Sequence, residues 1–291
     1  MIREIAPAKV NLFLHVGQKR GDGYHDLESL VVFADVGDEL SFEPAGELSL
    51  EIEGPFAHAL ANEPDNLILR AAREFARHAQ IEQSVKITLT KNLPVASGIG
   101  GGSSDAAAAL RGLSRLNPGR LSLPQLWNIG HDLGSDVPVC VMPASWWMTG
   151  RGERFATVDS FGTFDAVLVN SGAPVATAAA YAGLRDRRGI GAVKRPPRLT
   201  TMTALTDYLQ PTGNDLEAPA RALFPEIATQ IAELEKTDAM LARMSGSGAT
   251  CFGLYADEVR ARRAADLIKA EHPGWWVVAT KLNRSRKWNF Q

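Results

Sequence analysis

Cysteine is scarce in this sequence. The 291 residues include two, Cys140 and Cys251, and both stand in apolar stretches, VPVCVM and TCFGLY. This argues against a disulfide framework or a cysteine-ligated metal, and it is typical of small buried side chains. The low count fits a reducing compartment, so we expect a cytoplasmic protein.

Long apolar runs and a surplus of one charge are also missing. No run approaches the roughly 20 apolar residues that span a bilayer, and Arg3 and Glu4 stand where a signal peptide would be apolar. Lys and Arg total 31 against 33 Asp and Glu. This balance disfavours nucleic acid and membrane surfaces as partners. We expect a small-molecule partner, and both a monomer and a homodimer stay open.

Two familiar phosphate-binding loops are excluded by missing residues. The mononucleotide loop needs Gly-Lys-Ser/Thr, and the sequence has no Gly-Lys pair. The dinucleotide fingerprint G-x-G-x-x-G would need its third glycine at position 103, which is Ser103.

What the sequence does have is a glycine cluster, PVASGIGGGSS (94–104), followed directly by DAAAAL. The glycines allow several backbone N–H groups to converge on one point, and a helix N-terminus that faces the same point attracts an anion. Ser103 and Ser104 stand where the helix begins and can cap it or bind a ligand. The cluster therefore predicts a site for a phosphate chain, although a flexible serine-capped turn stays open on the cluster alone.

Hydrophobic periodicity predicts both strands and helices, and thus an α+β protein. The expected strands are 9–16, segments within 31–54, 85–94, a strand entered by a turn at VPVCVM (137–142), 164–172 and a final tryptophan-bearing strand. The expected helices are 65–79, the alanine-rich helix after the glycines, one beginning near 121, one over 216–236 and a last one before the final strand. We expect a glycine-rich loop over 17–30 and a mobile surface connection over 185–199. The length favours two domains, 1–155 and 156–291.

Three motifs in order resemble those of the GHMP kinases, the small-molecule kinases named for galactokinase, homoserine kinase, mevalonate kinase and phosphomevalonate kinase. They are APAKVNLFLHV, PVASGIGGGSSDAAAAL and SGSGATCFGLY, which together span nearly the whole chain. The resemblance implies a two-domain fold in which nucleotide and acceptor meet in the cleft between the domains.

Finer features resemble one branch of that family. They are the stretch AKVNLFLHVGQKRGDGYHDLESL, LGSDVPVCV with Ser135 in place of the usual alanine, and GNDLE (213–217). The resemblance implies ATP-dependent phosphorylation of the tertiary 2-hydroxyl of a cytidine diphosphate-linked methylerythritol, in the non-mevalonate route to isoprenoid precursors. The segment 174–199 matches least.

The resemblance also assigns roles to individual residues. It makes Asp136 the acceptor of the hydroxyl proton and Lys9 its neighbour on the transferred group; a buried charge pair without catalytic work is the alternative. The implied ATP-binding residues are Pro94, Val95, Ala96, Ser97, Gly98, Ile99, Gly100, Gly101, Gly102, Ser103 and Ser104. The implied acceptor residues are Asn11, Tyr24, His25, Thr177, Tyr181, Ser245, Gly246, Ser247 and Gly248.

The implied cofactors are ATP and Mg²⁺. We expect Mg²⁺ to be held mainly by phosphates and water, with Ser104 as the best protein candidate. No dedicated metal site is predicted, because the histidines other than His25 show no ligand spacing; they are His15, His58, His78, His131 and His272.

Two alternatives remain. A kinase for homoserine, mevalonate or a sugar would not need Tyr24, His25 and Tyr181. A non-catalytic sensor would keep the fold without turnover, since fold does not guarantee chemistry. The presence of both Lys9 and Asp136 argues against the sensor.

Overall fold

The computed structural model describes residues 1–61, 65–82, 84–172, 175–185, 189–196 and 198–284. Its strands are β1 Ile2–Lys19, β2 His25–Pro44, β3 Ser49–Glu53, β4 Val85–Thr90, β5 Trp146–Gly150, β6 Arg154–Thr157, β7 Phe164–Asn170, β8 Leu241–Met244, β9 Cys251–Tyr255 and β10 Trp276–Leu282. Its helices are η1 Ala57–Leu60, α1 Leu67–Ala79, α2 Gly101–Leu116, α3 Leu123–Leu133, α4 Val137–Val141, α5 Thr177–Ala182, α6 Met202–Leu209, α7 Glu217–Leu223, α8 Glu226–Lys236 and α9 Glu258–Glu271. The α+β class is thereby confirmed.

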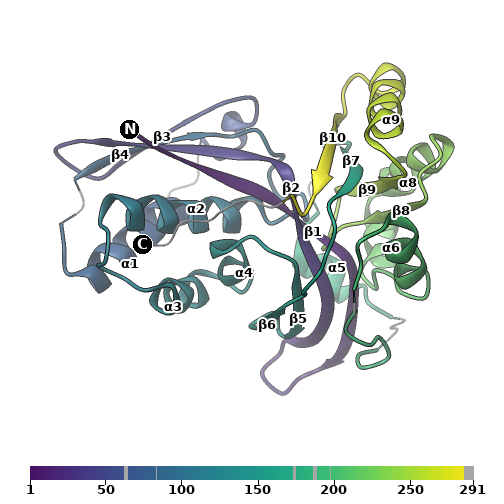
Figure 1. The fold of residues 1–291 in the computed structure, drawn as a ribbon, viewed down its shortest axis with the longest axis horizontal. Coiled ribbons are helices and arrows are strands. Elements are labelled where there is room, and N and C mark those ends of the chain that lie inside the picture. Colours follow the sequence, from purple (N-terminus) through teal and green to yellow (C-terminus); the bar gives the residue numbers. More distant parts are fainter. Residues whose placement is uncertain (62–64, 83, 173–174, 186–188, 197, 285–291) are drawn as a thin grey trace.

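The strands among these residues form a single hydrogen-bonded sheet with the path β3-β4-β2-β10-β7-β9-β8, to which β1, β5 and β6 are joined through β2. The helices α1 to α4 lie together on one side of the first part of the sheet, and α6, α8 and α9 lie around its second part (Figure 1). The last strand, β10, connects the two parts through the pair Leu282 and Ala34. Among the described residues, no helix is both long and apolar enough to cross a bilayer.

The long β1–β2 hairpin is the centre of the molecule (Figure 1). Strand β1 was expected over 9–16, and it extends to Lys19, which pairs with His25. The predicted loop over 17–30 is therefore wrong in length: a turn over 20–24 suffices, because Gly23 adopts a φ of +87° that a tight turn favours.

Strand β1 also binds the second half of the chain. The backbone N–H of Leu14 donates to the carbonyl of Gly213, and the N–H of Asp215 donates to the carbonyl of Leu14, both at 2.9 Å. The carboxylate of Asp215 accepts from the N–H of Val16 at 2.8 Å. A strand from the first half is thus held by main-chain bonds to the second, and the division at 155/156 stays a prediction.

Two further sequence expectations are wrong. The stretch VPVCVM forms helix α4 and not a strand. Pro138 stands within the first two positions of this helix, where a proline is favoured because no intrahelical partner for its backbone nitrogen is needed. The helix expected over 216–236 is divided into α7 and α8, since Pro225 cannot continue a helix that ends at Leu223.

Candidate active site

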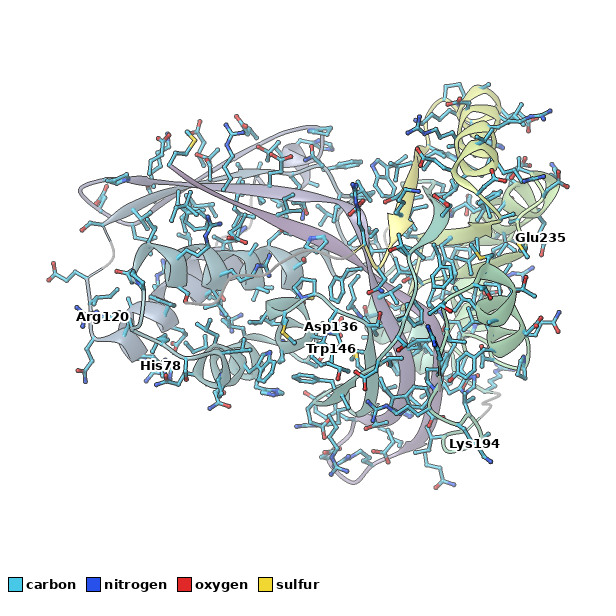
Figure 2. All side chains as sticks on the ribbon, viewed as in Figure 1. His78, Arg120, Asp136, Trp146, Lys194 and Glu235 are labelled. Atoms are coloured by element: carbon cyan, nitrogen blue, oxygen red, sulfur yellow. The ribbon has the colours of Figure 1, made fainter. Side chains whose placement is uncertain are left out.

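A cavity of about 1010 Å³ opens between the two halves of the chain. Of the residues predicted for the site, it is lined by Lys9, Asn11, Tyr24, His25, Ala96, Ser97, Gly98, Gly100, Gly101, Gly102, Ser103, Asp136, Thr177, Tyr181, Gly246 and Ser247. Figure 2 shows Asp136 near the middle of the molecule, where the two parts of the sheet meet. Residues far apart in sequence are therefore brought to one cavity.

Lys9 and Asp136 form an ion pair in this cavity, with 3.1 Å between Nζ and Oδ2. The lysine side chain is 5% exposed and the carboxylate is 36% exposed, so solvent or a ligand reaches the carboxylate. Among the described residues that line the cavity, Asp136 is the one with a carboxylate side chain. It precedes α4, where it is held at the start of a buried helix.

Asn11 lies two residues beyond Lys9 on β1 and therefore points to the same side of the sheet. Its Oδ1 accepts a hydrogen bond from Lys9 Nζ at 3.1 Å, and its Nδ2 donates to Ser29 Oγ at 2.8 Å. The chain Ser29–Asn11–Lys9–Asp136 is thus fixed from β2 to α4. It presents one ammonium and one partly exposed carboxylate to the cavity.

The glycine loop packs directly on the C-terminal glycine motif. Gly98, with a φ of +75°, would place a Cβ 2.6 Å from the N of Gly248 and the O of Ser245. A Cβ on Gly246 would lie 2.5 Å from the carbonyl oxygen of Gly98. Thr250 N–H also donates to the Ser97 carbonyl at 3.0 Å. The two motifs meet backbone to backbone, which explains why glycine stands at these positions.

Helix α2 begins immediately after this contact, with Gly100 as its N-cap at a φ of +62°. The first N–H groups of a helix have no partner within it, and they face the loop side where Gly101, Gly102 and Ser103 line the cavity. A backbone free of Cβ atoms at a helix N-terminus is suited to a phosphate chain.

A buried charge cluster supports this loop from below. Lys91 Nζ lies 2.6 Å from both Asp38 Oδ2 and Asp105 Oδ2, and all three side chains are nearly or fully buried. Burial would lower the pKa of Lys91, but the charges of Asp105 and Asp38 outweigh it and raise that pKa. Burial raises the pKa of the Asp105 carboxyl well above its usual range, against the opposing effect of Lys91.

This shift predicts how Asp105 affects stability. Because the folded protein holds the Asp105 proton more tightly than the unfolded chain does, the contribution of Asp105 to stability falls as pH rises above about 4. We expect the midpoint of thermal unfolding of Asp105→Asn, minus that of the parent protein, to increase between pH 5 and pH 8. Asp65→Asn, at a carboxylate that is 67% exposed, is the matched control and should show a flat difference. A flat difference for Asp105→Asn as well would contradict the shift.

The opposite end of the cavity is aromatic. The rings of His25 and Tyr181 stack with centroids 5.5 Å apart and planes at 29°. His25 Nδ1 lies 3.1 Å from the carbonyl oxygen of Gly17, which leaves the other ring nitrogen for a ligand. Burial, with a smaller effect of Asp136, raises the pKa of Tyr181 to about 12, so its hydroxyl stays protonated at neutral pH.

Tyr24 and Thr177 complete this end. Tyr24 is 59% exposed, and the guanidinium of Arg151 lies 5.0 Å from its ring centroid. Thr177 Oγ1 and Ser247 Oγ share a hydrogen bond of 2.9 Å across the cavity wall. Arg151 and Lys19 also line the cavity, although neither is among the predicted site residues. Arg151 lies outside the family motifs, and Lys19 lies within the stretch 8–30 but has no role assigned by the resemblance.

The other predicted site residues do not line the cavity, and two of them, Ser104 and Ser245, form hydrogen bonds that hold the loops in place. The full set is Pro94, Val95, Ile99, Ser104, Ser245 and Gly248. Ser104 is fully buried, and its hydroxyl donates to the carbonyl of Pro7 at 2.8 Å. Ser245 Oγ accepts from the N–H of Asn11 at 3.1 Å and is likewise buried.

The pair Asn214–Asp215 has a similar supporting position. Asn214 Nδ2 donates to the carbonyls of Met244 and Gly246 at 2.9 and 2.8 Å, so it holds the C-terminal glycine motif. Asp215 binds the N–H of Val16 on β1. The GNDLE signature therefore fixes the cavity wall from behind.

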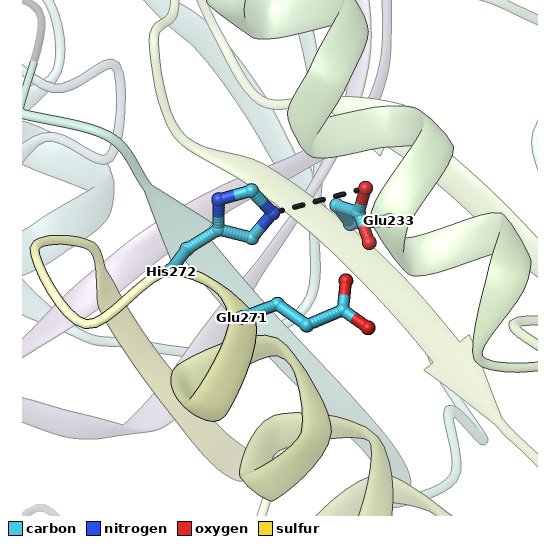
Figure 3. Close-up of side chains that lie close together, drawn as sticks. All are labelled: Glu233, Glu271 and His272. Atoms are coloured by element: carbon cyan, nitrogen blue, oxygen red, sulfur yellow. Dashed lines mark ion pairs between the residues drawn. The ribbon is translucent and has the colours of Figure 1, made fainter.

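One group of metal-ligating side chains occurs elsewhere in the described part of the chain. Glu233, Glu271 and His272 place ligand atoms within 4.8 Å of one another, and Figure 3 shows the three side chains converging between two helices. Lys236 Nζ already lies 2.5 Å from Glu233 Oε1. The ammonium of Lys236 therefore already supplies a positive charge to this group of side chains. None of the three residues lines the cavity described above.

Two family models match this chain, each over a different range. The model of the GHMP kinases N terminal domain matches residues 66–143, and that of the GHMP kinases C terminal matches residues 199–273. A homoserine kinase structure from Cytophaga hutchinsonii has a TM-score of 0.75 at 18% identity, covering 98% of this chain and 95% of the other. That likeness shows the fold alone.

Nearer relatives share one name. The 4-diphosphocytidyl-2-C-methyl-D-erythritol kinases of Parvibaculum lavamentivorans and Paracoccus denitrificans are 48% and 49% identical, covering 95% and 96% of this chain and 96% of each relative. A crystal structure of 4-(cytidine 5'-diphospho)-2C-methyl-D-erythritol kinase is 32% identical, with a TM-score of 0.79, and covers 98% of this chain and 100% of its own. The chain belongs to the 4-diphosphocytidyl-2-C-methyl-D-erythritol kinase family, a branch of the GHMP kinases.

Proposed function

We propose that this protein transfers the γ-phosphoryl group of ATP to the 2-hydroxyl of 4-diphosphocytidyl-2-C-methyl-D-erythritol, a step in the methylerythritol phosphate pathway to isoprenoid precursors. The observation that carries the proposal is the single cavity in which the Lys9–Asp136 pair, the glycine loop and the His25–Tyr181 stack lie together. Each of the three suits one part of the reaction: the chemical step, the phosphate chain and a flat base.

The chemical step requires placement and charge stabilisation more than a strong base, because the transition state of phosphoryl transfer is loose. Asp136 accepts the proton of the attacking hydroxyl through its partly exposed carboxylate. Lys9, fixed by Asn11, orients that carboxylate and stabilises charge on the transferred group. The family-assigned roles of the two residues thus fit their geometry.

The nucleotide and its metal fit the other end of the cavity. The N-terminal turn of α2, with Gly101 and Gly102, would hold the phosphate chain of ATP. Mg²⁺ would be held mainly by phosphates and water and would neutralise charge there. Ser104, the protein candidate favoured by the sequence, donates its hydroxyl to Pro7 and does not line the cavity, whereas the neighbouring Ser103 does.

An ATP-consumption assay tests the function. The purified protein is given a panel of alcohols: the cytidine diphosphate-linked methylerythritol, the same methylerythritol phosphate without cytidine, homoserine, mevalonate and a hexose. We expect turnover that depends on the cytidine diphosphate moiety. Equal turnover with homoserine, mevalonate or the sugar would replace the acceptor assignment, and no turnover with any alcohol would favour the sensor alternative.

The aromatic end predicts a separation of kinetic constants. Removing one stacking face removes on the order of 1–3 kcal/mol of base binding. We therefore expect Tyr181→Ala to raise the KM for the acceptor with little change in kcat, and Tyr24→Ala to raise it less, because its ring is 59% exposed. The KM for ATP, measured in the same variants, serves as the control. An unchanged acceptor KM in both variants would contradict the cytidine assignment.

A further inference from the structure

Arg111 is a buried arginine in the middle of α2, 3% exposed, and its guanidinium contacts two other elements, β1 and α4. Nε donates to Glu4 Oε2 at 3.0 Å, and Nη2 donates to the carbonyl of Ile5 at 2.5 Å. Nη1 donates to the carbonyl of Cys140 at 2.7 Å and to that of Val141 at 3.4 Å. One side chain thus joins α2 to β1 and to the C-terminal end of α4.

These contacts are made to the two elements that carry Lys9 and Asp136, and not to the two residues themselves. Strand β1 carries Lys9 four residues after Ile5, and α4 begins directly after Asp136 and ends at Val141. The guanidinium therefore binds the far end of the helix whose start holds Asp136, and also the strand that holds Lys9. Its planar fork has enough donors to satisfy both at once.

Helix α2 makes a second contact with β1, near its own N-terminus. Its N-terminus follows the glycine loop, and Ser104 in its first turn is already bonded to the carbonyl of Pro7 on β1. Arg111 lies two turns further along the same helix. The two contacts fix α2 against the part of β1 that leads into Lys9, and Arg111 alone of the two also reaches α4.

We propose that Arg111 is a positioning residue that sets the separation of Lys9 from Asp136, and so places the proton acceptor at the attacking hydroxyl. The proposal rests on the function proposed above, in which Asp136 takes that proton. Arg111 itself does not line the cavity, so it acts through α4 and β1.

The chain offers a matched control in Arg115, one turn later on the same helix. Its Nη1 donates to Glu4 Oε1 at 2.6 Å and to the carbonyl of Arg3 at 3.0 Å. It therefore binds the same carboxylate as Arg111, at the other oxygen, and its side chain is 45% exposed. These bonds join Arg115 to β1, whereas those of Arg111 also reach α4.

The test compares Arg111→Lys with Arg115→Lys by steady-state kinetics well below each variant's unfolding midpoint. Lysine keeps the charge but loses the fork. A misplacement of about 1 Å can reduce a rate on the order of 10²-fold, so we expect a fall in kcat of tenfold to a hundredfold in Arg111→Lys, with both KM values nearly unchanged. Arg115→Lys should keep the parent kcat. A normal kcat in folded Arg111→Lys would overturn the proposal.

A double-mutant cycle separates this proposal from the proposed function. If Arg111 acts through Asp136, Arg111→Lys should have little further effect in the Asp136→Asn background. A full additive effect would overturn the positioning role. Normal turnover in Asp136→Asn alone would instead refute the assigned chemistry. Should Arg111→Lys not fold, Glu4→Gln decides: a lower kcat at unchanged KM values supports the proposal, and an unchanged kcat overturns it.

Discussion

Replacing Asp136 with asparagine is expected to reduce kcat by roughly 10²- to 10⁴-fold, because the side chain keeps its shape and loses its ability to accept a proton. The KM for ATP should change little, since the phosphate loop lies on another element. The measurement is steady-state kinetics with the cytidine diphosphate-linked acceptor. Circular dichroism and thermal unfolding first show that the variant is folded.

The matched control for this variant is Asp132→Asn, at an exposed aspartate on α3 four residues earlier. It should leave kcat unchanged. Lys9→Met should also depress kcat, because it removes the cation next to the transferred group and leaves Asp136 and Asn11 without that partner. A near-normal kcat in Asp136→Asn would remove this carboxylate from the mechanism and leave the pair a buried charge contact.

The second large effect is expected at Gly102. A Cβ placed there would meet nothing nearer than a methyl group of Leu67 at 3.7 Å, so the folded protein has room for a side chain. The same position lies in the first turn of α2 and lines the cavity. Gly102→Val should therefore weaken ATP binding by about tenfold or more, or 1.4 kcal/mol and upward, while the unfolding midpoint changes little. Calorimetric titration with ATP measures it.

Neighbouring glycines provide the contrast. A Cβ on Gly101 would lie 3.2 Å from Lys91 Nζ, so Gly101→Val is expected to weaken ATP binding and also to disturb the buried charge cluster. A Cβ on Gly98 would lie 2.6 Å from the backbone of the C-terminal motif, and Gly98→Val should lower the unfolding midpoint first. Normal ATP affinity in folded Gly102→Val would show that the phosphate chain lies elsewhere.

Much of the fold could be predicted from the sequence because its strongest local signals agree with the tertiary structure. Alternation along β1 and the 3.6-residue period of α1 indicated elements of the right type, and the glycines marked the start of α2. The stretch around Pro138 misled, because a buried run of five residues is apolar on all sides whether it is strand or helix. Phe224 and Pro225 end one helix and begin another, a break that proline signals.

The residues of the site likewise include some that could be predicted from the sequence and some that could not. Residues within motifs, such as Lys9 and Asp136, could be chosen from the sequence, because their resemblance to family patterns is specific. Arg151 and Arg111 could not, since a single arginine in a loop or a helix has the same local sequence signal whether it lines a cavity, joins two elements or faces solvent. Their positions result from long-range packing that no local pattern encodes.

The hydrogen bonds that the main chain of Leu14 and Val16 on β1 forms with residues 213–215 have a consequence for how ligands enter and leave. If the two halves of the chain moved apart by a hinge motion, these hydrogen bonds would have to break, together with the pairing of β10 with β2. We therefore expect both halves to move as one body throughout a turnover. Exchange of product for fresh acceptor then depends on small excursions of surface segments such as the 20–24 turn, which carries the exposed ring of Tyr24.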